Sequence, residues 1–267
     1  MQWFLALAEG SPAFKQYGEM AMVAIHTALR HTKLRPHFLY DGGENELTRW
    51  LREREVPIIP CHTFVLEELA DLRCGEREAM VRAALRGILL RIELPRLGLE
   101  MDLDDRVFYT DSDVFFLGEV TDELAAIDCR YFAVAPEFNP QDYREMNTGA
   151  MWMNLPGLRE VDADFRRFVR ENLPRLQSVA WDQGAYREFF CGPGEEPKWD
   201  KLRPELNWKP YWGDYSSAKI IHFHGPKPYH RDYIDSHFSE LKHLTGGCYE
   251  EICDLWTDWL EEAKQPL

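Results

Sequence analysis

Two short polar segments of this chain have the residue types needed to hold a metal ion beside a diphosphate. Asp111-Ser112-Asp113 follows the apolar run 106–110, and a second apolar run ends at His222. Carboxylate oxygens suit Mg²⁺ and Mn²⁺, and an imidazole can complete an oxygen-rich Mn²⁺ site. Gly225 and Lys227 follow His222 closely. A glycine lets backbone approach a phosphate, and a lysine brings a compact positive charge, so the chemistry indicated is diphosphate binding through a metal.

The Asp-x-Asp spacing alone is a weak signal, because a chain with 46 acidic residues produces it by chance. Asp102 and Asp104 have the same spacing, but they precede the apolar run 106–110 instead of following it. We interpret that first pair as a solvated turn. Without further signals, a simple strand-end turn is as good an interpretation of Asp111 and Asp113 as a metal site.

The elements around these segments predict an α/β domain. Residues 2–8, 37–40 and 56–60 have the pattern of strands, and residues 15–30 and 44–54 have the pattern of helices. This alternation favours a parallel sheet covered by helices. In such sheets ligands bind at the carboxyl ends of the strands, where Asp111 and Asp113 are expected.

The later part of the chain continues the alternation. Helices are expected over residues 76–97, 160–172 and 180–190, and strands over 106–110, 131–135, 150–153 and 219–223. The segment 191–214, rich in Gly, Pro and Trp, is expected to be irregular, and the tail 230–263 to form two amphipathic helices. We therefore expect one α/β domain over residues 1–230, with a helical extension over 231–267 packed on it.

Composition narrows the function classes. The 267 residues carry a net charge of −15, which disfavours a nucleic-acid partner. No stretch approaches the ~20 apolar residues of a membrane-spanning helix, so no transmembrane segment is expected. The apolar start runs directly into Glu9 and is interpreted as a strand, not a signal peptide. Six scattered cysteines without a CxxC pair indicate reduced, packed thiols, and a cytoplasmic location is expected.

Four segments in order resemble the retaining glycosyltransferases of family 8, which include glycogenin and bacterial lipopolysaccharide galactosyl- and glucosyltransferases. They lie between about residues 86 and 232, and they are Val107-Phe108-Tyr109-Thr110-Asp111-Ser112-Asp113-Val114, Asn147-Thr148-Gly149 before an apolar strand, Asp182-Gln183 at a helix start, and His222-Phe223-His224-Gly225-Pro226-Lys227-Pro228-Tyr229. The resemblance implies a Rossmann-like GT-A fold with a mixed sheet. It also implies transfer of a hexose from a nucleotide-diphosphate sugar, with UDP as the expected nucleotide, to a hydroxyl acceptor.

The resemblance assigns roles to matched positions. The metal ligands for Mn²⁺ or Mg²⁺ would be Asp111, Asp113 and His222. The catalytic pair beside the reacting carbon would be Asp182 and Gln183. The other donor-binding residues would be Ala8, Tyr17, Arg91, Ser112, Asn147, Gly149, Gly225 and Lys227. The acceptor, whether glycan, lipid-linked or protein, is not indicated.

Several positions depart from the family pattern or allow another interpretation. One residue fewer than usual separates Gly225 from Lys227, and the loop 9–16 lacks the acidic-asparagine-tyrosine pattern, which leaves the base open. Arg91 could instead be a solvated helix charge, and Tyr17 a core aromatic residue. His224 could be a second metal ligand or an acceptor contact, but we expect it to be a surface side chain.

Two other functions fit parts of the pattern. A phosphatase of the haloacid-dehalogenase type would use Asp111 as nucleophile and Asp113 as general acid, but its later Gly-Asp-x-x-x-Asp pair is missing from the sequence. A non-catalytic carbohydrate-binding module would use the abundant tryptophans for stacking. That module leaves the metal and phosphate residues unexplained.

Overall fold

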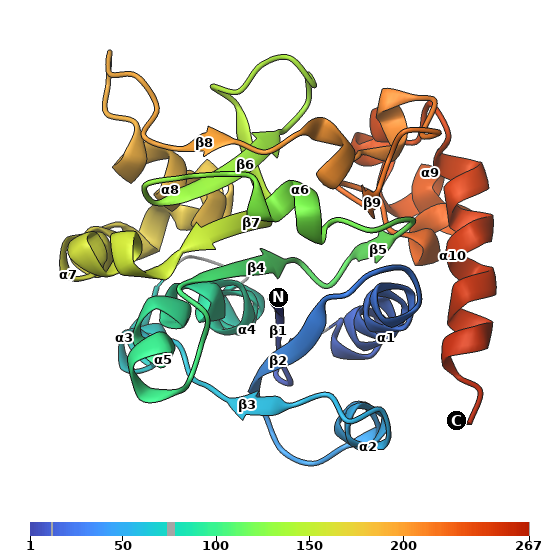
Figure 1. The fold of residues 1–267 in the computed structure, drawn as a ribbon, viewed down its shortest axis with the longest axis horizontal. Coiled ribbons are helices and arrows are strands. Elements are labelled where there is room, and N and C mark those ends of the chain that lie inside the picture. Colours follow the sequence, from blue (N-terminus) through green and yellow to red (C-terminus); the bar gives the residue numbers. More distant parts are fainter. Residues whose placement is uncertain (12, 74–77, 267) are drawn as a thin grey trace.

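The computed structural model describes residues 1–11, 13–73 and 78–266, and a mixed sheet of seven strands runs through it (Figure 1). In spatial order the strands are β3 (Ile58–Pro60), β2 (Arg35–Asp41), β1 (Gln2–Ala8), β4 (Arg106–Thr110), β7 (Met146–Asn154), β6 (Phe132–Pro136) and β8 (Asp200–Lys201). A small second sheet pairs β5 (Val114–Phe116) with β9 (Ile220–His222). The expected mixed sheet of a GT-A-like α/β domain is therefore present.

The first half of the sheet is parallel, and the second half is mixed, since β8 runs parallel to β6. Strands β3, β2, β1 and β4 run parallel, so their carboxyl ends meet at one edge. Strand β7 runs antiparallel to both β4 and β6. The prolines of the segment 56–60 led us to expect an edge strand, and β3 does lie at the edge.

Helices cover both faces of the sheet. Their bounds are α1 (Phe14–His31), α2 (Glu46–Glu53), α3 (Leu66–Asp71), α4 (Glu78–Ile88), α5 (Leu94–Glu100), α6 (Thr121–Ala125), α7 (Leu155–Asn172), α8 (Trp181–Phe190), α9 (Ile234–His237) and α10 (Tyr249–Ala263). Side chains alternate across β1 because successive residues of a strand point to opposite faces. Trp3 and Leu5 pack with α1 and α2, whereas Phe4 and Ala6 pack with the α4 side.

Two segments differ from their expected form. The expected helix over 76–97, whose first two residues lie outside the described residues, is divided into α4, a 3₁₀ turn (Leu89–Glu93) and α5. Pro95 lies in the first turn of α5, where it needs no backbone donor and helps to start a new helix.

The tail contains one long helix, α10, instead of two. Before it, 3₁₀ turns (Pro228–Tyr233 and Ser239–Leu244) flank the four-residue α9. Stacking of His230 on Phe238 stabilises this compact arrangement in place of a continuous helix. Helix α10 lies beside α1, and the two helices share an apolar cluster with β9 (Figure 1).

The remaining expectations concern membranes and thiols. None of the helices in the described part of the chain is long and apolar enough to cross a membrane. The five described cysteines are unpaired, and Cys61, Cys129 and Cys253 are buried, in line with a packing role. Cys74 lies outside the described residues.

Candidate active site

A cavity of about 370 Å³ opens at the carboxyl ends of β1 and β4. Its lining brings together distant parts of the chain. The expected site residues found in it are Ala8, Tyr17, Arg91, Asp111, Ser112, Asp113, Asn147, Asp182, Gln183, His222, Gly225 and Lys227. Residues expected from four separate sequence segments therefore share one cavity.

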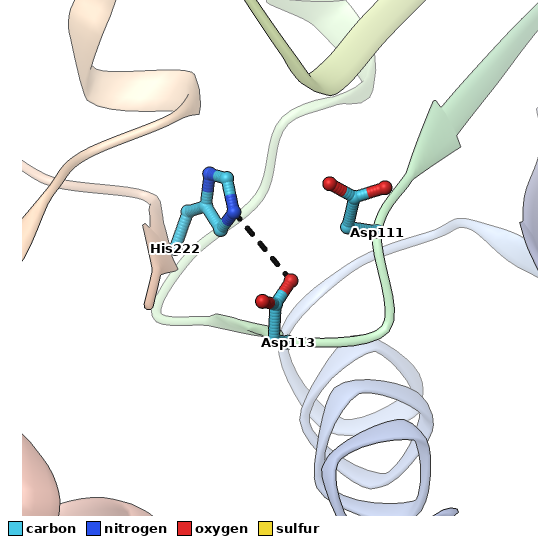
Figure 2. Close-up of side chains that lie close together, drawn as sticks. All are labelled: Asp111, Asp113 and His222. Atoms are coloured by element: carbon cyan, nitrogen blue, oxygen red, sulfur yellow. Dashed lines mark ion pairs between the residues drawn. The ribbon is translucent and has the colours of Figure 1, made fainter. Parts of the chain in front are cut away.

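Asp111, Asp113 and His222 offer three ligand atoms that all lie within 4.8 Å of one another. Figure 2 shows the three side chains directed toward a common point. Asp111 follows β4 directly, and Asp113 precedes β5. The antiparallel pairing of β5 with β9 sets Val114 opposite His222, which carries the imidazole to the aspartates.

The chemistry of this donor set fits a divalent cation. Asp113 Oδ1 is buried and accepts no hydrogen bond from any described residue, and His222 Nε2 lies 3.5 Å from it. The side-chain amide of Asn207 donates to Asn147 Oδ1 at 2.9 Å, which leaves its Oδ1 to accept from His222 Nδ1 at 2.9 Å. His222 Nε2 therefore keeps its lone pair for a metal.

Asp111 lies on a rigid side of the site, built around Arg91. The guanidinium of Arg91 contacts Asp111 at 2.5 Å and Asp182 at 2.9 Å, and it donates to the backbone oxygen of Thr148. Arg91 is 3% exposed and lies over the ring of Tyr109, so its interpretation as a solvated helix charge is wrong. Burial raises the pKa of Asp182 to about 6, although Arg91 opposes the shift.

Asp113 lies on the other side, against Lys227. The ammonium of Lys227 contacts Asp113 Oδ2 at 2.5 Å and donates to the backbone oxygen of Phe223. Burial alone would raise the pKa of Asp113, but Lys227 and His222 together lower it overall. Gly225 has a φ of 93°, a conformation suited to glycine, and it turns the chain between His222 and Lys227.

The far end of the cavity carries amides and a carboxylate. Gln183 Oε1 accepts from the side chain of Asn147 at 2.8 Å, and Gln183 Nε2 donates to Glu137 at 2.8 Å. Ala180, which precedes helix α8, and Trp181, its first residue, both have positive φ. This unusual turn directs Asp182 and Gln183 into the cavity.

The expectation that His224 is a surface side chain is wrong. His224 lines the cavity, its Nε2 lies 3.3 Å from Glu137, and its Nδ1 lies 2.8 Å from the hydroxyl of Tyr211. Burial lowers the pKa of His224 to about 4. With both ring nitrogens already in contact with protein groups, His224 positions Glu137 and has no nitrogen left for a metal.

Gly149 does not line the cavity but lies behind His222 and supports its position. A Cβ atom built at Gly149 would lie 2.1 Å from His222 Cε1, so only a glycine allows the imidazole to lie against β7. Gly149 also accepts a hydrogen bond from the backbone of Asp111. It therefore sets the positions of two of the expected metal ligands.

Another part of the cavity lining comes from β1, α1 and α4. Ala8 and Tyr17 face Ala83 and Gly87 of α4 there. Glu9 points elsewhere, since its carboxylate accepts from the backbone of Gly43 and from Asn45. The loop 9–16, which includes residue 12 outside the described residues, thus directs its acidic group away from the cavity.

Sequence reasoning missed Glu137, Asn207 and Tyr211. Glu137 directly follows the apolar run 131–135 and Pro136, so its strand-end position was a usable signal. Asn207 and Tyr211 lie in the irregular segment 191–214, which no periodicity organises. Backbone bonding of Trp208 to β9 fixes this segment beside His222, and nothing in the sequence predicts that contact.

No protein-family model matches the chain, and no curated protein matches it. Solved structures do resemble it. The galactosyltransferase LgtC, solved with donor and acceptor sugar analogs, has a TM-score of 0.63 at 17% identity over 99% of this chain and 97% of that one. Mouse xyloside xylosyltransferase 1 has a TM-score of 0.51 at 15% identity, over 84% of this chain and 97% of that one.

The glycosyltransferase GlyE of Streptococcus pneumoniae has a TM-score of 0.58 at 16% identity. The match covers 99% of this chain and 65% of GlyE, so this chain spans about two thirds of that protein. At such identities the likeness establishes the fold. The expected GT-A type of α/β domain is confirmed, with Asp111 and Asp113 beside a strand end.

Proposed function

We propose that this chain is a metal-dependent retaining glycosyltransferase of family 8 that takes a hexose from a nucleotide-diphosphate sugar, with UDP as the first nucleotide to test. The observation that supports this most is the set of Asp111, Asp113 and His222 at the strand ends of a GT-A fold, with Lys227 in contact with Asp113. Two carboxylates, one imidazole and an ammonium suit a divalent cation together with a diphosphate.

The cavity suggests how a donor would lie in it. The small residues Ala8 and Gly87, which lie against each other, and the ring of Tyr17 suit a nucleoside, and Ser112 lies between the two aspartates. Gly225 and Lys227 also line the cavity, and they would give a diphosphate the close backbone and the positive charge that it needs. The amides of Asn147 and Gln183, with the carboxylate of Glu137, suit the hydroxyl groups of a sugar at the far end.

The chemistry follows from this arrangement. A divalent cation held by Asp111, Asp113 and His222 would offset the charge of the departing diphosphate. Lys227 would hold the same diphosphate from the other side. Asp182 and Gln183 would place the sugar carbon and stabilise its positive charge as the bond to the diphosphate breaks. The acceptor hydroxyl would attack from the same face and give its proton to the leaving diphosphate oxygen, which retains the configuration.

The phosphatase alternative has less support in the geometry. A phosphatase that used Asp111 as nucleophile and Asp113 as general acid would have no role for His222, whose imidazole lies in the same cluster. A carbohydrate-binding module would have no use for a buried ammonium beside a carboxylate pair. Transfer is therefore the function that uses all of these residues.

The direct test is donor consumption. The protein would be incubated with UDP-, GDP- and ADP-hexoses and Mn²⁺, and release of the nucleoside diphosphate would be followed with and without simple sugar acceptors. We expect release from one class of donor, loss of release in Asp113→Asn, and a product with the anomeric configuration of the donor by NMR. Steady phosphate release from phosphate esters without use of any donor would instead support the phosphatase.

A further inference from the structure

Each carboxylate of the Asp-x-Asp pair is in contact with one protein cation, and the two cations differ in how firmly they are held. Arg91 also binds Asp182 and a backbone oxygen. The ammonium of Lys227 has two described hydrogen-bonding contacts, with Asp113 Oδ2 and with the backbone oxygen of Phe223. Arg91 is thus fixed from several directions, whereas Lys227 is held at the end of a flexible side chain.

The backbone of Lys227 is firmly placed even though its side chain has these few contacts. The hydroxyl of Tyr249 donates to the backbone oxygen of Lys227 at 2.9 Å, and the backbone N–H of Lys227 donates to His230 at 3.1 Å. The chain therefore keeps the base of the side chain in place. Four methylene groups allow the ammonium to move while the loop stays where it is.

The ammonium lies where it competes with a divalent cation for the same carboxylate. It contacts Oδ2 of Asp113, and the other oxygen, Oδ1, faces His222 and Asp111. Two positive centres on one buried carboxylate repel each other strongly, because little water separates them. A cation that binds Oδ1 therefore weakens the contact of Lys227 with Oδ2, and Lys227 weakens the binding of that cation.

We propose that Lys227 is a tethered counter-ion of Asp113, which leaves Asp113 for the diphosphate when a divalent cation binds, so that cation and diphosphate bind cooperatively. The proposal rests on the proposed function for the identity of the diphosphate. The part that concerns the bare cation does not depend on a nucleotide. A bare cation meets the repulsion of Lys227, whereas a diphosphate provides the ammonium with a new anionic partner.

The first test measures Mn²⁺ affinity without nucleotide, by the electron paramagnetic resonance signal of free Mn²⁺. Lys227→Met removes the charge and keeps the length of the side chain. We expect it to bind Mn²⁺ about tenfold more tightly than the unchanged protein, a coupling of ordinary size. Lys242→Met is the matched control, because Lys242 is 62% exposed and pairs with Asp235 on the same tail. Equal or weaker binding in Lys227→Met overturns the proposal.

The second test uses the unchanged protein and therefore stands even if Lys227→Met does not fold. UDP and inorganic pyrophosphate should each raise Mn²⁺ affinity about tenfold, and UMP should not, because it lacks the second phosphate. Where Lys227→Met folds, this coupling should shrink. No gain with either diphosphate overturns the cooperative claim.

Failure of the proposed function gives a different result. If Asp113→Asn binds Mn²⁺ as well as the unchanged protein does, the metal site itself is wrong. If Mn²⁺ binds through Asp113 and Lys227→Met tightens it, but no diphosphate has any effect, then the counter-ion part stands and the nucleotide-sugar function fails.

Discussion

The two sides of the candidate active site are built from the same kinds of charge but are held in different ways. On one side the buried Arg91 and Asp182 form a group with the partly exposed Asp111, and the cation of this group lies in a 3₁₀ turn and has partners in three segments. The other side lies at the small β5–β9 sheet and the loop that follows β9. There Asp113 contacts both His222 and Lys227. The contacts of the first group stabilise the fold. In the second group, we propose that Lys227 exchanges its contact with Asp113 for one with a diphosphate.

This difference predicts which substitutions should change the stability of the fold and which should change the binding of a ligand. Buried charges with several partners are costly to leave unpaired, so changes on the Arg91 side should act on folding. Changes on the His222 side should act mainly on cation affinity, since that side is free to accept a ligand.

The largest expected effect is on folding, from Arg91→Met. It leaves the buried Asp182 and the partly exposed Asp111 without their cation, and we expect the free energy of unfolding to fall by about 3–5 kcal/mol. Chemical denaturation measures this. Arg96→Met is the control, because Arg96 is 52% exposed and pairs with Asp162, so it should cost less than about 1 kcal/mol. Similar losses in the two variants would remove the contrast between the two sides.

The next effect is the pH dependence of Asp182. Its pKa in the folded protein, about 6, lies above that of an unfolded aspartate, so the folded state holds the proton more tightly. The resulting stability is fully present below about pH 4 and is lost as pH rises through about 6, by roughly 2–3 kcal/mol. Unfolding of the metal-free protein between pH 4 and 7, compared with Asp182→Asn, measures it. Parallel curves for the two proteins would contradict the assignment.

On the His222 side, Asn207→Ala should lower cation affinity and leave the fold intact. The variant removes the acceptor that keeps the proton on His222 Nδ1, and loss of such an orienting partner typically weakens metal binding about 10–100-fold. Mn²⁺ titration measures the loss. Asn172→Ala, which removes contacts with the backbone of Phe168 and with Arg175 but none with the cavity lining, should bind Mn²⁺ normally. A fall in thermal stability without any change in affinity would show that Asn207 is merely structural.

The smallest effect concerns the turn that starts α8. Ala180 has a φ of 64°, a conformation that costs an alanine more than a glycine. Ala180→Gly should therefore raise the free energy of unfolding by roughly 0.5 kcal/mol, after the greater freedom of glycine in the unfolded chain is subtracted. Denaturant titrations repeated on several independent protein preparations resolve a change of this size. A clear loss of stability would mean that this turn carries no strain.

The parts of the site predicted from sequence are those that lie on regular elements. Apolar runs placed Asp111 at a strand end and His222 at the end of another, and the sheet topology then brought them together. The alternation of strands and helices likewise predicted the parallel half of the sheet. In both cases local periodicity carried the information.

The parts that could not be predicted depend on contacts between irregular segments. Asn207 reaches His222 because backbone bonds of Trp208 attach its segment to β9, and His224 is held in the cavity by its contacts with Tyr211 and Glu137. The burial of Arg91 follows from three partners in three different segments. No local sequence pattern predicts such contacts between distant segments.

The central claim is that Asp113 helps to hold a cation and, through it, a nucleoside diphosphate. The most direct measurement is a thermal-shift titration with UDP, GDP and ADP, each with and without Mn²⁺, on the unchanged protein and on Asp113→Ala. A ligand that binds only the folded state raises the melting temperature by mass action. We predict a rise that needs both Mn²⁺ and Asp113, with UDP giving the largest. An equal rise in Asp113→Ala, or none with any of the three nucleotides, would contradict the claim.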